Sequence, residues 1–299
     1  MKKSVSMLLA ALMLTGALAG CGSSASTSDS QAADGADSGV SGAITVISRE
    51  DGSGTRGAFI ELTGVEEKTA DGKKVDNTTA DAEIANKTDV VLTSVAGNEK
   101  AIGYISLGAL NDTVKAVKVD GAEATVDNVK AGAYKLSRPF NIATKGEPTG
   151  VAKDFINFIL SKEGQAVVTD NKYIAVNDAA ESFVSDGSSG QIAVGGSSSV
   201  SPVMEKLIEA YKSVNPNASI DLQTSDSTSG MTGAMDGTFA IGMASRELKD
   251  EEAAQLTGTA IALDGIAVIV NPANTIDELS MDQIKSIYIG DITDWGDLA

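Results

Sequence analysis

From Ala43 onward, short runs of β-branched and other apolar residues alternate with segments in which apolar residues recur every three or four positions. This alternation is typical of an α/β architecture with a largely parallel sheet. The runs predict strands over residues 44–48, 102–105, 114–119, 191–194, 219–223, 239–243 and 266–270. Helical spacing predicts helices over 57–62, 150–162 and 203–214, and a Ser-x-x-Gln capping box at Ser280 predicts one more. We interpret the apolar stripes of these helices as core positions rather than cofactor contacts.

The first residues have the pattern of an export signal. Lys2 and Lys3 precede an apolar run, and the run leads to the tetrapeptide Leu-Ala-Gly-Cys ending at Cys21. This tetrapeptide resembles the lipobox of bacterial lipoproteins, so we expect residues 1–21 to hold a signal peptide and a lipidation site at Cys21. A cleaved signal with an incidental cysteine is the alternative. Residues 22–42 are too polar to bury a core and are expected to form a flexible linker, and residues 182–190 a second one.

The composition excludes several kinds of chemistry. The 299 residues suffice for two lobes of roughly 130 residues each. Histidine is missing, which excludes Ser-His-Asp and Cys-His catalysis, and a single cysteine excludes internal disulfides. The formal net charge of −18 disfavours nucleic acid, which is itself an anion. Motifs for P-loop nucleotide binding, the nucleophile elbow and EF-hand chemistry do not occur. We therefore expect no enzyme, no cofactor and no metal site.

Three loops of small residues follow predicted strands and precede helical patterns, where unpaired backbone N–H groups favour an anion. The first is Arg-Glu-Asp-Gly-Ser-Gly-Thr over 49–55, in which Arg49 adds a forked charge and Ser53 and Thr55 add hydroxyls. The others are residues 195–202, and residues 225–230 together with 244–246. A tight turn capped by Asp51, and ordinary serine-rich linkers or caps, remain alternatives for each loop taken alone. Together, the loops favour binding over turnover.

Seven segments resemble the phosphate-binding protein of bacterial high-affinity phosphate ABC transporters. They are residues 48–56, 102–106, 136–139, 155–165, 196–202, 242–246 and 264–272. The resemblance covers nearly everything from Ala43 to Ala299, and the Arg-x-Asp-Gly-Ser-Gly-Thr segment is its most specific part. It implies an α/β, two-lobed periplasmic-binding-protein fold of type II, the Venus-flytrap arrangement, with the ligand in a cleft between the lobes.

The order of the segments differs from the order expected of that family. The family's Gly-Ser-Ser loop comes first, whereas here it follows the Arg-x-Asp-Gly-Ser-Gly-Thr segment, so the sequence looks circularly permuted with the old ends joined through 182–190. A truncated or misassembled tandem gene is the alternative. We expect one lobe over 113–273 and the other over 43–112 together with 274–299.

The resemblance also implies the phosphate ligands. They fall on Arg49, Asp51, Ser53, Gly54 and Thr55 from one lobe and on Ser198, Ser199, Ser227 and Ser245 from the other. Ser245 departs from the proteobacterial pattern, which places a carboxylate there; this leaves Asp51 as the main acceptor and brings in Arg246 as a further candidate. Asp51 would accept the proton that phosphate carries near neutral pH, and it would repel sulfate, which has none.

The implied function is that of an extracytoplasmic lipoprotein, anchored to the cell membrane through Cys21. It would capture inorganic phosphate as a monomer and deliver it to the permease and ATPase subunits of an ABC transporter. Another tetrahedral oxyanion, such as sulfate, molybdate or phosphonate, is the alternative ligand. A phosphate-sensing interaction module is an alternative function, and an acid hydrolase is disfavoured because no loop contains a spaced pair of carboxylates.

Overall fold

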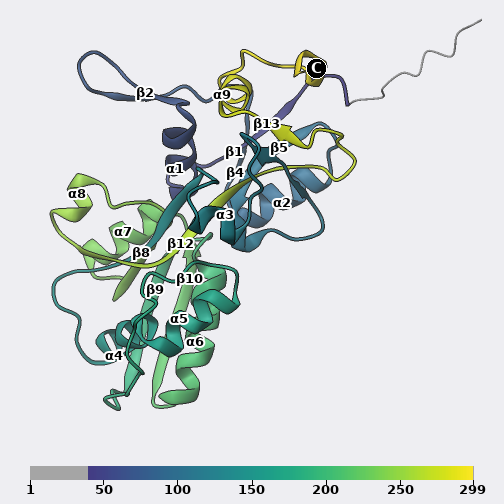
Figure 1. The fold of residues 1–299 in the computed structure, drawn as a ribbon. Coiled ribbons are helices and arrows are strands. Elements are labelled where there is room, and N and C mark those ends of the chain that lie inside the picture. Colours follow the sequence, from purple (N-terminus) through teal and green to yellow (C-terminus); the bar gives the residue numbers. More distant parts are fainter. Residues whose placement is uncertain (1–39, 299) are drawn as a thin grey trace, which may run out of the picture. The chain divides into compact units, whose positions relative to one another are not determined.

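A computed structural model describes residues 40–298, which belong to one compact unit (Figure 1). Cys21, the predicted signal and most of the predicted linker lie outside the described residues. Among the described residues, no helix combines the length and the apolar character needed to cross a membrane.

The centre of the fold is a nine-stranded mixed sheet. Its eight consecutively paired strands, in spatial order, are β10 (Ala218–Ser225), β9 (Gly190–Ser197), β11 (Ile241–Ala244), β8 (Ser137–Thr144), β12 (Thr257–Val270), β5 (Ala101–Ser106), β1 (Thr45–Arg49) and β4 (Glu83–Ala85). The ninth strand, β6 (Lys115–Ala116), pairs with β12. Two smaller pairs are β2 (Glu66–Lys68) with β3 (Lys74–Asp76), and β7 (Lys118–Val119) with β13 (Glu278–Leu279).

The sheet is parallel at its two ends and antiparallel in the middle. Strands β10, β9 and β11 are mutually parallel, as are β5, β1 and β4, whereas β8 and β12 pair antiparallel with each other and with their outer neighbours β11 and β5. The predicted strands are all confirmed in position, although 114–119 divides into two short strands. Strand β8 was not predicted, because its Ser-Arg-Pro start does not have the pattern of a β-branched run.

Two large hydrophobic cores and one small cluster of buried apolar residues around Met231 lie along this sheet in the described part of the chain. The first core contains Phe59, Ile102, Tyr288 and Trp295, and the second contains buried side chains such as Leu207. Strand β12 contributes to both: Ile261 and Ala262 pack in the second core, whereas residues 266–270 pack in the first. The sheet therefore continues from one core into the other through β8 and β12.

The division between the cores differs from the predicted lobe boundaries. Val114, Val117 and Val129, expected in the lobe over 113–273, pack in the first core, as does the second half of β12. The reason is that β12 is one continuous strand of 14 residues, so a single strand supplies residues to both cores. The chain passes from the first core to the second between Leu136 and Phe140, and it returns to the first core between Ala262 and Ile266.

The helices follow the strands with the expected signals at their ends. The longer ones are α1 (Gly54–Thr63), α2 (Thr88–Ala96), α4 (Gly150–Leu160), α5 (Lys162–Asp170), α6 (Ser201–Val214), α7 (Ser227–Asp236) and α9 (Met281–Ile289). The short ones are α3 (Val126–Lys130), α8 (Asp250–Ala253), η1 (Leu107–Ala109) and η2 (Trp295–Leu298). The predicted capping box of α9 is confirmed: Gln283 N–H donates to Ser280 Oγ at 3.1 Å, and Ser280 N–H donates to Gln283 Oε1 at 2.8 Å.

Both predicted linkers make specific contacts where the structure describes them. Gly42 N–H donates to Asp294 Oδ1 at 2.9 Å, so residues next to β1 already belong to the fold. Ala43 also forms a β-bridge with Asp294, which places the start of the sheet beside the last described turn. In the second linker, Ser185 and Asp186 donate to the carboxylate of Asp154 on α4. These contacts fit the circular permutation, which stays a prediction.

Candidate functional site

Hydroxyl groups gather where several strands end and helices begin. Strand β1 leads into α1, β4 into α2, β9 into α6 and β10 into α7, and the first turn of each helix directs backbone N–H groups toward the strand ends. Ser53 caps α1 by accepting from Arg56 N–H at 3.3 Å, so Ser53 rather than Asp51 is the cap. The arrangement favours negative charge at these helix starts.

A buried hydroxyl cluster joins these elements. We define it as Thr55 of α1, Thr88 of α2, Ser198 and Ser199 after β9, and Ser245 after β11, all of which are buried. Thr55 Oγ1 lies 2.8 Å from Ser199 Oγ and 3.3 Å from Ser245 Oγ. Thr88 Oγ1 lies 3.3 Å from Ser198 Oγ and 3.4 Å from Ser199 Oγ. The cluster thus connects elements of the first core to loops of the second.

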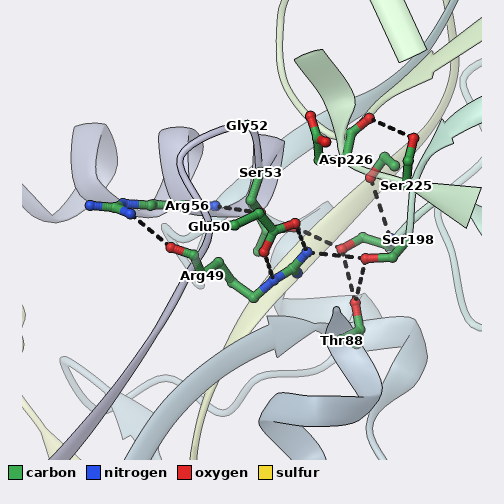
Figure 2. A network of polar contacts seen from close by, with 12 residues as sticks. Arg49, Glu50, Gly52, Ser53, Arg56, Thr88, Ser198, Ser225 and Asp226 are labelled. Carbon is green, nitrogen blue, oxygen red and sulfur yellow. Dashed lines mark hydrogen bonds and ion pairs between the residues drawn. The ribbon is translucent and has the colours of Figure 1, made fainter. Parts of the chain in front are cut away.

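Arg49 lies against this cluster (Figure 2). Its side chain is 2% exposed, and its Nη2 donates to Ser198 Oγ at 3.1 Å. Its Nε and Nη2 also donate to the two carboxylate oxygens of Glu50, each at 2.8 Å. Its Nη1 is buried without a hydrogen-bond partner. Arg49 therefore offers the cluster one unsatisfied N–H donor group of a charged side chain.

Tyr104 of β5 fixes the backbone at Arg49. The Tyr104 hydroxyl accepts from Arg49 N–H at 3.1 Å and lies 2.9 Å from Ser48 Oγ. Burial raises the pKa of Tyr104 to about 12, so its hydroxyl stays protonated and can both donate and accept. Phe59 of α1 stacks on the Tyr104 ring with the centroids 4.0 Å apart, which ties the arginine loop to the first core.

Two further candidates pack around the start of α1. Gly54 approaches the loops of the second core so closely that an added Cβ would lie 2.4 Å from Ser227 Oγ and 2.8 Å from Ser245 Oγ. Only glycine fits there without moving the hydroxyls. Ser227 opens α7 and accepts from Ser245 N–H at 3.1 Å. The structure therefore brings together eight of the predicted residues: Arg49, Ser53, Gly54, Thr55, Ser198, Ser199, Ser227 and Ser245.

Asp51 and Arg246 do not join the cluster. The side chain of Asp51 is 96% exposed and accepts from Arg56 Nη1 at 2.7 Å. Arg246 forms two hydrogen bonds with the carboxylate of Glu252, at 2.7 and 2.8 Å. The physical reason is the same in both cases, because a nearby partner of opposite charge holds each side chain away from the hydroxyls. The carboxylate beside Arg49 is Glu50, which sequence reasoning had not assigned.

Besides Glu50, sequence reasoning missed three residues at the site. The first is Thr88, which belongs to a helix that no glycine-rich loop precedes. The second is Ser197 at the end of β9, whose Oγ donates to Ser245 Oγ at a distance of 3.0 Å. Arg138 comes from β8, and its Nη2 lies 3.4 Å from Thr55 Oγ1. Arg138 stands in the Leu-Ser-Arg-Pro segment that carried the family resemblance, which was the one signal for it.

The cluster is suited to an anion rather than a cation. Three buried side-chain atoms of residues 40–298 lack a hydrogen-bond partner: Arg49 Nη1, Arg138 Nε and Tyr173 Oη. Two of them are guanidinium nitrogens at the hydroxyl cluster, and a buried charged donor without an acceptor is costly. Within the described part of the chain, no group of three or more acidic, cysteine or histidine residues could hold a metal ion.

A cavity of about 580 Å³ opens next to the loop at Gly52 and contains none of the cluster residues. Asp226 and Asp236 contribute to its lining, together with hydroxyl groups of α7. Carboxylates without a paired cation disfavour an anion, so this cavity does not compete with the cluster as an oxyanion site.

Comparisons with known proteins agree with this fold. A family model described as a PBP superfamily domain matches residues 24–163 and 182–299. The phosphate-binding protein PstS 2 of Streptococcus agalactiae serotype V is 50% identical over 300 residues, covering 99% of this chain and 98% of the relative. PstS 2 of Streptococcus pneumoniae serotype 4 is 48% identical over 296 residues, with 99% of each chain covered.

A solved structure gives the same result. The crystal structure of a phosphate-binding protein of a phosphate ABC transporter from Streptococcus pneumoniae TIGR4 is 50% identical and superimposes with a TM-score of 0.69. The match covers 86% of this chain and all of that one. The chain therefore belongs to the PBP superfamily, within the family of phosphate-binding PstS proteins.

Proposed function

We propose that this protein binds inorganic phosphate at the hydroxyl cluster and delivers it to an ABC transporter. The observation that carries the proposal is the unsatisfied Nη1 of Arg49, buried against hydroxyls that the two cores contribute jointly. Phosphate supplies acceptor oxygens in several directions, which satisfies the guanidinium and the hydroxyls at once. The family relationship supports phosphate as the anion, because the relatives are named phosphate-binding proteins.

Glu50 takes the role that the sequence had suggested for Asp51. Phosphate near neutral pH carries a proton that a carboxylate can accept, whereas sulfate meets a carboxylate with lone pairs only. Glu50 is 21% exposed and adjacent to the arginine of the site, and Asp51 points into solvent. Glu50 therefore favours oxyanions that carry a proton, and its negative charge repels sulfate, which carries none.

Delivery to a transporter requires the protein to work outside the cytoplasmic membrane. The signal-like residues and the lipobox-like tetrapeptide support export and lipidation at Cys21. The protein then acts as a monomer above the membrane and hands phosphate to the permease and ATPase subunits of a phosphate ABC transporter. It is a carrier rather than an enzyme.

The circular permutation is part of the same proposal. The relatives align with this chain over nearly their whole lengths, so they share its segment order, which argues against a misassembled gene. The permutation that we propose is therefore one that these two relatives share. The β-bridge between Ala43 and Asp294 supports the proposed original connection, because the two segments that it would join already lie together.

The test is a calorimetric titration of the purified protein with phosphate, alone and in the presence of a hundredfold excess of sulfate. The proposal predicts one phosphate per chain and an unchanged affinity in sulfate. The absence of phosphate heat at any accessible concentration would refute the phosphate site. Displacement of phosphate by sulfate would instead support a general tetrahedral-oxyanion binder.

A further inference from the structure

Arg138 and Asp264 face each other where the chain passes between the two cores. They are directly paired in the register of β8 and β12, next to the positions at which both strands change core. Arg138 Nη1 forms a buried ion pair with Asp264 Oδ2 and also donates to the carbonyl of Gly265 at 2.7 Å. The phosphate-binding resemblance gave neither residue a role.

The other edge of the Arg138 guanidinium is open toward the hydroxyl cluster. Nε is buried without a partner, and Nη2 makes only a long contact of 3.4 Å with Thr55 Oγ1. Nε and Nη2 lie on one edge of the planar group, and this edge matches two oxygens of a carboxylate or phosphate. On that edge, one donor group, Nε, has no partner, and the other, Nη2, makes a single long hydrogen bond to the hydroxyl of Thr55, which links the cores.

Asp264 fixes the direction of this edge. Its side chain is fully buried, and it accepts from Ser106 Oγ at 2.6 Å and from Gly108 N–H at 3.3 Å in addition to Arg138. With Nη1 held by Asp264 and by the Gly265 carbonyl, the planar guanidinium has no freedom to rotate away from Thr55. A lysine in place of Arg138 would keep the charge and lose the two-pronged edge.

We propose that Arg138 is a second guanidinium ligand of the anion, binding it through the Nε and Nη2 edge, and that Asp264 is the residue that positions Arg138. The inference rests on the proposed phosphate function. Arg49, which belongs to the first core, and Arg138, which lies at the passage between the cores, then hold the same anion from two directions. Each guanidinium has its own carboxylate partner, so the site gains donors without a net positive charge.

Calorimetric titration with phosphate tests the proposal in five variants. Arg138→Lys and the double variant Arg138→Gln with Asp264→Asn are each expected to weaken binding about 30-fold or more, the cost typical of losing a buried charged partner. The double variant removes both charges, so no unpaired buried ion remains to unfold the protein. Asp154→Asn is the matched control, because it alters a buried aspartate that accepts hydrogen bonds in the second core, and its affinity is expected to stay unchanged.

The remaining variants, Asp264→Asn alone and Arg138→Gln alone, separate positioning from general stability. Asp264→Asn is expected to weaken binding in the wild-type background, and the double variant is expected to bind no more weakly than Arg138→Gln, because Asp264 acts through Arg138. Equal, additive losses in both backgrounds would overturn the positioning role. Affinities within threefold of wild type for Arg138→Lys and for the double variant would overturn the ligand role. Failure of the wild-type protein to bind phosphate would instead refute the proposed function.

Discussion

Replacing Arg49 with methionine removes the charge and the forked donors while keeping an unbranched side chain of similar length. In the structure, Arg49 is almost fully buried. Its Nη2 donates to Ser198 and to Glu50, whereas its Nη1 has no partner and is the donor available to an anion. Truncating one member of a buried, hydrogen-bonded charge pair costs about 2–5 kcal/mol of binding free energy. At about 1.4 kcal/mol per tenfold change, the dissociation constant for phosphate is expected to rise from about 30-fold to about 4,000-fold.

The stability of the folded protein is expected to change far less than the affinity. Glu50, which loses its partner, already has 21% of its side chain exposed, so water can take over its hydrogen bonds. We therefore expect a loss of about 1 kcal/mol in the free energy of unfolding. Calorimetric titration with phosphate measures the affinity, and denaturant unfolding measures the stability.

Arg56→Gln is the matched control, because Arg56 pairs with Asp51 and Asp76 outside the hydroxyl cluster. Its affinity for phosphate is expected to fall far less than that of Arg49→Met, because the Arg56 side chain touches the site only through the Arg49 carbonyl, to which its Nη1 donates at 2.8 Å. Wild-type affinity in Arg49→Met, with the variant folded, would refute the assignment of Arg49 as the principal charged ligand.

Three further predictions follow from the placement of the carboxylates. Asp51→Asn is expected to leave the phosphate affinity within about threefold of wild type by calorimetry, because the side chain is exposed and paired with Arg56; a large loss would return Asp51 to the site. Glu50→Gln is expected to narrow the preference for phosphate over sulfate in competition titrations, and an unchanged preference would exclude Glu50 as the selective group. Burial acts to raise the pKa of Asp154, but hydrogen bonds from Asp186 N–H, Tyr211, Ser185 and Asn215 outweigh it and hold the pKa below the usual 3.8. Asp154 therefore stabilises the fold above that pH and loses this contribution as the pH falls through its lowered pKa. The melting temperature of Asp154→Asn should accordingly fall less steeply with acid pH than that of the wild type. Equal slopes of melting temperature against pH in the two proteins would contradict this.

The sequence predicted the parts of the site that a local pattern encodes. Arg49, Gly54 and Thr55 stand in one loop between a strand and a helix, and small residues in such a loop predict an anion at the helix start. Ser198 and Ser199 follow the same rule on the other core. The strand positions were also predictable, because runs of β-branched residues report burial directly.

The remaining features depend on contacts between distant segments. Glu50 and Asp51 are neighbours in sequence, and only the positions of Arg49 and Arg56 in space decide which carboxylate turns to which guanidinium. Arg138 lies in the middle of the sheet, where no loop pattern marks a ligand. The division between the cores escaped prediction because β12 passes through it as one continuous strand, so no loop separates the residues of the two cores.

A crystal structure of the protein grown with phosphate tests the central claim most directly. The account predicts one phosphate within about 2.7–3.2 Å of Arg49 Nη1 and of the hydroxyls of Thr55 and Ser199, with groups from both cores in contact with it. A phosphate bound elsewhere, with Arg49 Nη1 still lacking a partner, would contradict the account.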